Sequence, residues 1–150
     1  MIFVNFSSDD LARSRTFYEA LGCEINPMFT DDNAVCVQWD EQSFFMILSR
    51  DFFARFTGDK RIIDAHTEVQ ALVALTRDSR AEVDNVVAAA LAAGGKIHRE
   101  PEDYGFMYQH AIQDPDGNVL EFFYMDPEVA AQGPDNYLAD HASAAVPEPI

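Results

Sequence analysis

The sequence predicts an α+β fold made of two copies of a βαβββ unit: one strand, one helix and three further strands. Two internal similarities support this prediction. Residues 17–22, at the end of a helical segment, have a counterpart in residues 89–94, about 72 positions later. The turn and strand over 40–48 have a counterpart in 114–123 at a similar offset. Similarity at a fixed offset indicates an internal repeat, and we expect the two units to join their sheets into one curved surface.

The first unit begins with a strand over residues 2–7, in which Phe3 and Asn5 share one face because side chains alternate along a strand. Asp9 or Asp10 caps the following helix, since a short acceptor side chain satisfies free backbone N–H groups at a helix start. Apolar residues recur at helical spacing until a glycine ends the helix. We expect two or three more strands, over residues 24–30, 34–39 and 44–49. A short helix or turn follows over residues 51–57.

The second unit follows a polar linker over residues 58–66. Its expected elements are a strand at 69–76, an alanine-rich helix at 79–93 and strands at 96–99, 106–113 and 119–125. The last strand is apolar on both faces, and Glu121 is its one carboxylate. Burying an unpaired carboxylate costs several kcal/mol. We therefore expect Glu121 either to border a partly wet cavity or to have a partner.

Length and charge narrow the class of protein. At 150 residues the chain forms one domain, with module one over about 1–57, module two over about 67–126 and a C-terminal arm over 127–150 that we expect to be partly disordered. The net charge of −16 excludes nucleic acid as a partner, because such a surface repels phosphate backbones.

The apolar segments are too short to cross a bilayer, and the N-terminus lacks the features of a signal peptide. We therefore expect no membrane association and a cytoplasmic location. Cys23 and Cys36 sit in apolar surroundings and are expected to be reduced core residues rather than a disulfide or a reactive thiol.

Several motifs then occur in a fixed order: Asp10-Leu11-Ala12-Arg13-Ser14, Phe17-Tyr18, Leu21-Gly22, Asp114-Pro115-Asp116-Gly117-Asn118 and Glu121. In this order and spacing the chain resembles the glyoxalase/bleomycin-resistance/dioxygenase superfamily (vicinal oxygen chelate, VOC). Residues 4–6, 29–31 and 105–108 further resemble its lactoylglutathione lyase-like bacterial subgroup. The resemblance covers about residues 1–126. It implies two βαβββ modules forming a cupped mixed sheet, a small-molecule ligand and a homodimer.

The resemblance also implies where a metal ion would bind. Metal-dependent members hold a divalent ion in the cup with four side chains from the first and last strands of each module. The matching positions here are Phe3, Met46, Leu72 and Glu121. Hydrocarbon side chains and a thioether are poor or impossible ligands for a hard divalent ion, so Glu121 is the only retained ligand position. We therefore predict no cofactor and keep a divalent metal ion as the less favoured alternative, since the lyase and dioxygenase reactions of the family depend on one.

Glu121 and His110 are the candidate catalytic residues. If Gln113 faces Asn118 across the turn, His110 directly faces Glu121, and the two form an acid–base couple near neutral pH. A bulge at Gly117 would shift the pairing by one residue and separate them. The alternatives are a structurally satisfied His110, and a Glu121 that is hydrogen-bonded to its neighbours and inert.

Four further residues are candidate ligand contacts. Asn5 and Phe3 would point into the cup, while Tyr108 and Phe106 share a face with His110 under strict alternation and would line an apolar pocket or pack in the core. Two functions remain open. One is a glyoxalase-like lyase or isomerase that uses Glu121 on a small carbonyl, thioether or aromatic compound. The other is metal-free binding and sequestration of a small cationic or aromatic molecule, as bleomycin-resistance members do.

Overall fold

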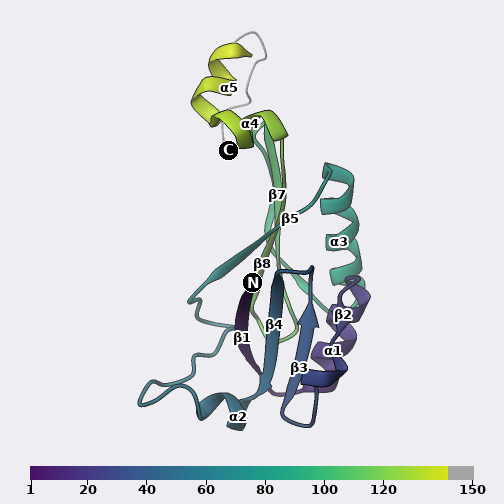
Figure 1. Cartoon of the computed structure of the whole chain (residues 1–150), viewed down its shortest axis with the longest axis vertical. Helices are drawn as coiled ribbons and strands as arrows, with labels where there is room; N and C mark the ends of the chain where they lie inside the picture. Colours follow the sequence, from purple (N-terminus) through teal and green to yellow (C-terminus); the bar gives the residue numbers. More distant parts are fainter. Residues whose placement is uncertain (142–150) are drawn as a thin grey trace.

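The computed structural model describes residues 1–141, which form two modules followed by two short helices (Figure 1). Module one contains β1 (Ile2–Ser8), α1 (Leu11–Ala20), β2 (Glu24–Ile25), the 3₁₀ turn η1 (Pro27–Phe29), β3 (Ala34–Gln38), β4 (Ser43–Ser49) and α2 (Arg50–Ala54). Module two contains β5 (Leu72–Thr76), α3 (Arg80–Ala92), β6 (Lys96–Asp103), β7 (Met107–Gln113) and β8 (Val119–Met125). The sheet orders are β1-β4-β3-β2 and β5-β8-β7-β6, which confirms the predicted repeat and the α+β class.

Each sheet is mixed, because its first strand runs parallel to its last strand and the other pairs are antiparallel. The two sheets are separate hydrogen-bonded units. Helices α1 and α3 cover the same side of the molecule and contact each other (Figure 1). We call the sheet faces turned away from these two helices the open faces.

Local sequence explains both long helices. The Asp10 side chain accepts a hydrogen bond from the backbone N–H of Arg13 at 2.9 Å, so Asp10 rather than Asp9 caps α1. Ser79 does the same for α3 by accepting from the N–H of Glu82. In α1 the buried side chains Phe17 and Tyr18 pack toward the sheets.

The strand predicted over 24–30 is shorter than expected. Only residues 24–25 pair with β3, and the chain then turns into η1. The Asn26 side chain accepts a hydrogen bond from the N–H of Met28, and Pro27 fixes the backbone angle at the first position of the turn. These two local preferences end the strand before it can continue.

One hydrophobic core joins the two modules. It contains buried side chains from α1, β3 and β4 of module one together with side chains from α3, β7 and β8 of module two. Trp39 lies at the boundary, with its ring 5.4 Å from Phe45 of its own module and 5.9 Å from Phe122 of the other. Cys23 and Cys36 are buried and free, as predicted.

A polar cluster also fastens the modules together. The Tyr18 hydroxyl donates to Asp114 at 2.6 Å, and Asp114 is only 3% exposed. Two residues later, Asp116 accepts from Arg13 and Ser14, each at 2.7 Å. Burial raises the pKa of both Tyr18 and Asp114. The turn at 114–118 thus docks module two onto α1 of module one.

The linker between the modules passes directly over this turn. Gly117 has φ of +93°, and a Cβ atom there would lie 2.6 Å from the carbonyl carbon of Ala65. Only glycine fits, for both conformational and steric reasons. The linker is therefore held at Ala65 against the turn that precedes β8.

Beyond module two the chain forms two short helices, α4 (Pro127–Gln132) and α5 (Pro134–Asp140), at one end of the molecule (Figure 1). The ring of Tyr137 in α5 stacks on His141 with centroids 4.1 Å apart. The last part of the predicted arm, residues 142–150, lies outside the described residues.

Candidate functional site

The open face of module one is apolar. Val4 and Phe6 of β1 pack against the core, so alternation turns Phe3, Asn5 and Ser7 to the open face. Phe3 stacks on Phe44 of β4, with ring centroids 4.8 Å apart, and is 47% exposed. Asn5 and Phe3 therefore lie on this face, and their contact with a ligand stays a prediction.

The open face of module two carries a polar network instead. Glu121 of β8 accepts a hydrogen bond from Arg99 of β6 at 2.6 Å, and its side chain is 16% exposed. Arg99 also donates to Glu102 at 2.9 Å, and Glu102 accepts from Gln109 and Tyr104. Glu121 therefore has the partner that its place in an apolar strand requires.

Electrostatics in this network favour the charged forms. The hydrogen bond to Glu121 is the main cause that raises the pKa of Arg99 above its ordinary value. The hydrogen bond from Gln109 is the main cause that lowers the pKa of Glu102, with Tyr104 and Arg99 acting in the same direction. Glu121 is held by Arg99 at 2.6 Å and is not free to reach a substrate proton, so this arrangement does not favour Glu121 as a general base.

The predicted facing of His110 and Glu121 is wrong. Glu121 pairs with Ala111, while His110 pairs with Phe122, which is fully buried. The backbone N–H of Asp114 donates to the carbonyl of Asn118, and this closing bond places Gln113 opposite Val119. The pairing is thus one residue away from the register predicted, and a shift of one residue moves a side chain to the opposite face.

His110 consequently lies on the helix-covered side of the sheet with Tyr108. Its Nε2 atom is buried and has no hydrogen-bond partner within residues 1–141. The Tyr108 hydroxyl donates to Asp84 of α3 at 2.7 Å, and burial, aided by this bond, raises the pKa of Tyr108 to about 12. The structure does not bring His110 and Glu121 together, and the catalytic role of each stays a prediction.

Phe106 is also away from the open face of module one. It lies in the loop before β7, with its ring 6.4 Å from Tyr104 and 6.3 Å from Tyr137 of α5. Neither Phe106 nor Tyr108 is among the residues that line the two cavities described next. Their contact with a ligand likewise stays a prediction.

The first of these cavities, the aromatic chamber, lies between the open face of module one and the helix α2. It has a volume of about 440 Å³ and is lined by Asn5, Met46, Leu48, Phe52, Phe53, Phe56 and Thr57. The rings of Phe52 and Phe56 meet edge to face at 5.3 Å. An apolar cavity with a few polar groups on its wall is typical of a small-molecule site.

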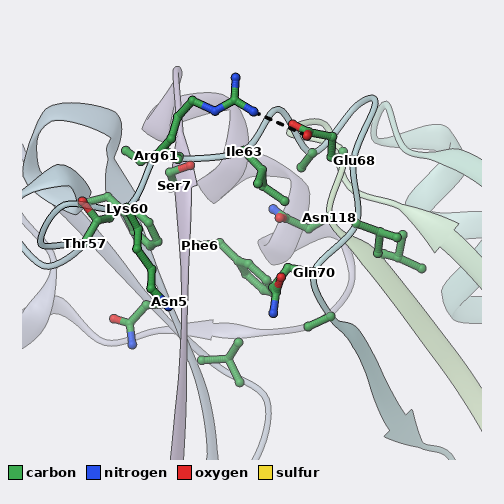
Figure 2. A pocket seen from close by; sticks show the side chains of 18 residues that line it. Asn5, Phe6, Ser7, Thr57, Lys60, Arg61, Ile63, Glu68, Gln70 and Asn118 are labelled. Atoms are coloured by element: carbon green, nitrogen blue, oxygen red, sulfur yellow. Dashed lines mark ion pairs between the residues drawn. The ribbon is translucent and has the colours of Figure 1, made fainter.

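A second cavity, the junction cavity, lies where the linker crosses between the modules (Figure 2). Its volume is also about 440 Å³, and its wall comes from β1, Phe53 of α2, the segment 57–71 and residues 117–119 at the turn into β8. Asn5, Phe53 and Thr57 line both cavities, which are therefore neighbours.

Comparison with known proteins identifies the family. A sequence profile of the glyoxalase/bleomycin resistance protein/dioxygenase superfamily matches residues 3–122. The chain belongs to this superfamily. Among curated protein sequences none matches the chain.

Solved structures of other superfamily proteins share the fold. A glyoxalase/bleomycin resistance protein/dioxygenase family enzyme from Burkholderia phytofirmans is 18% identical with a TM-score of 0.69, over 82% of this chain and 96% of that one. The bleomycin resistance determinant of the transposon Tn5 is 19% identical with a TM-score of 0.57, over 83% and 97%. A lactoylglutathione lyase from Agrobacterium tumefaciens is 18% identical with a TM-score of 0.62, over 83% and 92%.

The donor set of this superfamily member does not fit the metal site that the resemblance implies. Two of the four positions, Phe3 and Leu72, are hydrocarbon side chains, 47% and 52% exposed. Met46 offers only a thioether, and Glu121 is bound to Arg99. No cluster of three or more His, Cys, Asp or Glu side chains suited to a metal ion occurs within residues 1–141. The residues present therefore do not form this metal site.

Sequence reasoning missed the aromatic chamber and the linker residues that line the junction cavity. Phe52, Phe53 and Phe56 were expected only as one side of a short helix or turn. Their close spacing could have predicted an apolar site, because three phenylalanines within five residues beside a polar linker need an apolar surface to contact. As for membranes, none of the helices within residues 1–141 has the length and apolar character that a bilayer crossing requires.

Proposed function

We propose that this superfamily member binds an apolar, aromatic small molecule in the aromatic chamber without a metal ion. The apolar wall of the chamber is the observation that supports this proposal most directly. It includes Met46, which occupies a position where metal-dependent members of the family place a ligand for an ion. Its volume of about 440 Å³ falls within the usual size range of small-molecule sites.

The lining explains why an aromatic molecule suits the chamber. Three phenylalanine side chains offer ring faces and edges, and aromatic pairs gain about 0.5–1.5 kcal/mol beyond the burial of their area. Asn5 and Thr57 are the polar side chains on the wall and can fix the orientation of a ligand that carries a hydrogen-bonding group.

The arrangement of the other module favours binding over catalysis. Glu121 is held by Arg99 at 2.6 Å, and His110 lies on the opposite face of the same sheet. A base for an isomerisation or elimination must be free to reach a substrate proton. The alternative, a lyase or isomerase that uses Glu121, requires Arg99 to release it first.

The test uses N-phenyl-1-naphthylamine, a neutral aromatic probe whose fluorescence rises in an apolar site. Phe56→Ala should weaken binding of this probe about tenfold, because truncating a contacting phenylalanine removes roughly 1.5 kcal/mol or more of apolar burial. Phe56 is 69% exposed without ligand, so its loss should leave the fold intact.

Phe29→Ala is the matched control. Phe29 is 62% exposed and lines neither cavity, so its truncation should leave probe affinity unchanged. Equal effects of the two variants, or an absence of probe binding in the original protein, would contradict the proposal.

A further inference from the structure

The junction cavity departs from the charge of the rest of the molecule. The chain carries ten Lys and Arg against 26 Asp and Glu. Two of those ten cations, Lys60 and Arg61, are consecutive and both line this cavity. Among the residues 1–141 that line it, Glu68 is the one carboxylate, so this part of the wall is net positive within a strongly negative protein.

The two cations differ in how firmly they are engaged. Arg61 lies 3.7 Å from Glu68, and the two side chains are 85% and 47% exposed, so solvent screens this pair strongly (Figure 2). No ion pair of Lys60 occurs within residues 1–141. Both side chains can therefore turn to a bound anion with little loss of existing interactions.

The rest of the wall is mainly apolar. It includes Val4 and Phe6 of β1, Phe53 after β4, and Ile62 and Ile63 of the linker. Amide side chains of Asn5, Gln70 and Asn118 add hydrogen-bonding groups (Figure 2), although Asn118 already donates to Asp114 at 3.0 Å. An apolar wall with a cationic edge matches a ligand that has an apolar body and an anionic group.

We propose that the ligand of this protein is an aromatic anion, a carboxylate or sulfonate, whose charged group binds Lys60 and Arg61 in the junction cavity. Its apolar body extends past the shared residues Asn5, Phe53 and Thr57 into the aromatic chamber. This inference rests on the proposed function and adds the charge of the ligand to it. The overall acidity of the protein would instead favour a cationic ligand. The two nearby cations outweigh it here, because a bound ligand is attracted mainly by the nearest charges and distant charges are screened.

The test compares two probes that differ in one group. 1-Anilinonaphthalene-8-sulfonate has the aromatic body of N-phenyl-1-naphthylamine and an added sulfonate. The variant Lys60→Gln with Arg61→Gln should weaken binding of the sulfonate about tenfold and leave the neutral probe within about twofold, since a hydrogen bond to a charged group contributes about 1.5–3 kcal/mol.

The control changes the net charge by the same amount elsewhere. Lys96→Gln with Arg15→Gln removes two exposed cations, one from β6 and one from α1, that line neither cavity. It should leave both probes within about twofold, because charges beyond a Debye length are largely screened. Circular dichroism and thermal unfolding of both double variants would show that the fold is retained.

The outcomes separate the two proposals. If the neutral probe binds but the Lys60 and Arg61 variant leaves sulfonate binding unchanged, or weakens both probes equally, the anionic ligand is refuted and the proposed function stands. If neither probe binds to the original protein, the proposed function fails and the charge preference fails with it.

Discussion

The two modules have the same topology, but their open faces differ in chemical character. In module one the face is apolar and leaves a chamber of about 440 Å³ beneath α2. In module two it is occupied by charged and polar side chains that bind one another, with Arg99 between Glu102 and Glu121. The repeat therefore fixes the backbone and leaves the chemistry of each face free. The face of module one is suited to hold a ligand, whereas the polar side chains on the face of module two form hydrogen bonds and ion pairs with one another.

The largest expected difference between the modules is in how much the turns that precede β4 and β8 contribute to the free energy of unfolding. Asp114→Ala should lower the free energy of unfolding by about 3 kcal/mol or more, because it leaves the buried Tyr18 hydroxyl and the donors of Asn118 unpaired. The corresponding Asp40→Ala should cost much less, since Asp40 is exposed and accepts from the N–H of Gln42 in its own turn. Urea unfolding of both variants measures the difference, and equal losses would show that the turn at 114–118 does not fasten the modules.

Placing the carboxylate of module two into module one should have the next largest effect. Met46 is the repeat counterpart of Glu121, and Met46→Glu puts a carboxylate without an arginine partner into the aromatic chamber. We expect a loss of stability of about 2 kcal/mol at pH 7 and loss of N-phenyl-1-naphthylamine binding. Retained probe affinity would place the ligand somewhere other than this chamber.

Removing the cation of module two should have a moderate effect that depends on pH. Arg99→Met should cost about 1 kcal/mol at pH 7, a modest value because Arg99 is 40% exposed and solvent screens its ion pairs. The folded state lowers the pKa of Glu102, so this part of the stability is present above the ordinary glutamate pKa and is lost as pH falls through the lowered value.

The difference in stability between the Arg99→Met variant and the original protein should therefore become smaller as the pH is lowered. Thermal unfolding at pH 7 and at about pH 3.5 measures it, since glutamate titrates near 4.3 when unperturbed. A gap that stays constant between the two pH values would mean that Arg99 acts by packing rather than by charge.

The smallest effect is expected for Glu121→Gln, which keeps the shape and one hydrogen-bond acceptor toward Arg99. Binding of the neutral probe should stay within about twofold, because the proposed site is in the other module. Titration of the probe against this variant and against Phe56→Ala compares the two modules directly. A large loss of affinity, or of any turnover found for the protein, would return Glu121 to the functional site.

Patterns with a local cause could be predicted from the sequence. The alternation of side chains along a strand predicted the face on which Asn5 lies. A short acceptor side chain predicted where α1 begins, and the internal repeat predicted the two sheets. The partner of Glu121 could not be predicted, because β6 contains two register irregularities, one on each side of Arg99. Such shifts change which residues share a face, and simple alternation does not reveal them.

The cavities were beyond prediction for a different reason. Each wall combines strand residues with the segment after β4, and the path of that segment depends on tertiary contacts such as the close approach of Ala65 to Gly117. His110 shows the same dependence on a smaller scale, since one hydrogen bond across the turn, from Asp114 to Asn118, decides which face it occupies.

The shared core has a consequence for how the chain can be divided. A cut beside Gly58, in the exposed linker, would give two fragments that each carry an intact βαβββ unit and an uncovered half of the core. Because Trp39 and Phe122 pack across that boundary, neither fragment can bury its apolar side alone. The fragments should refold only when mixed, and their association would then measure in one binding constant how strongly the two halves of the repeat depend on each other.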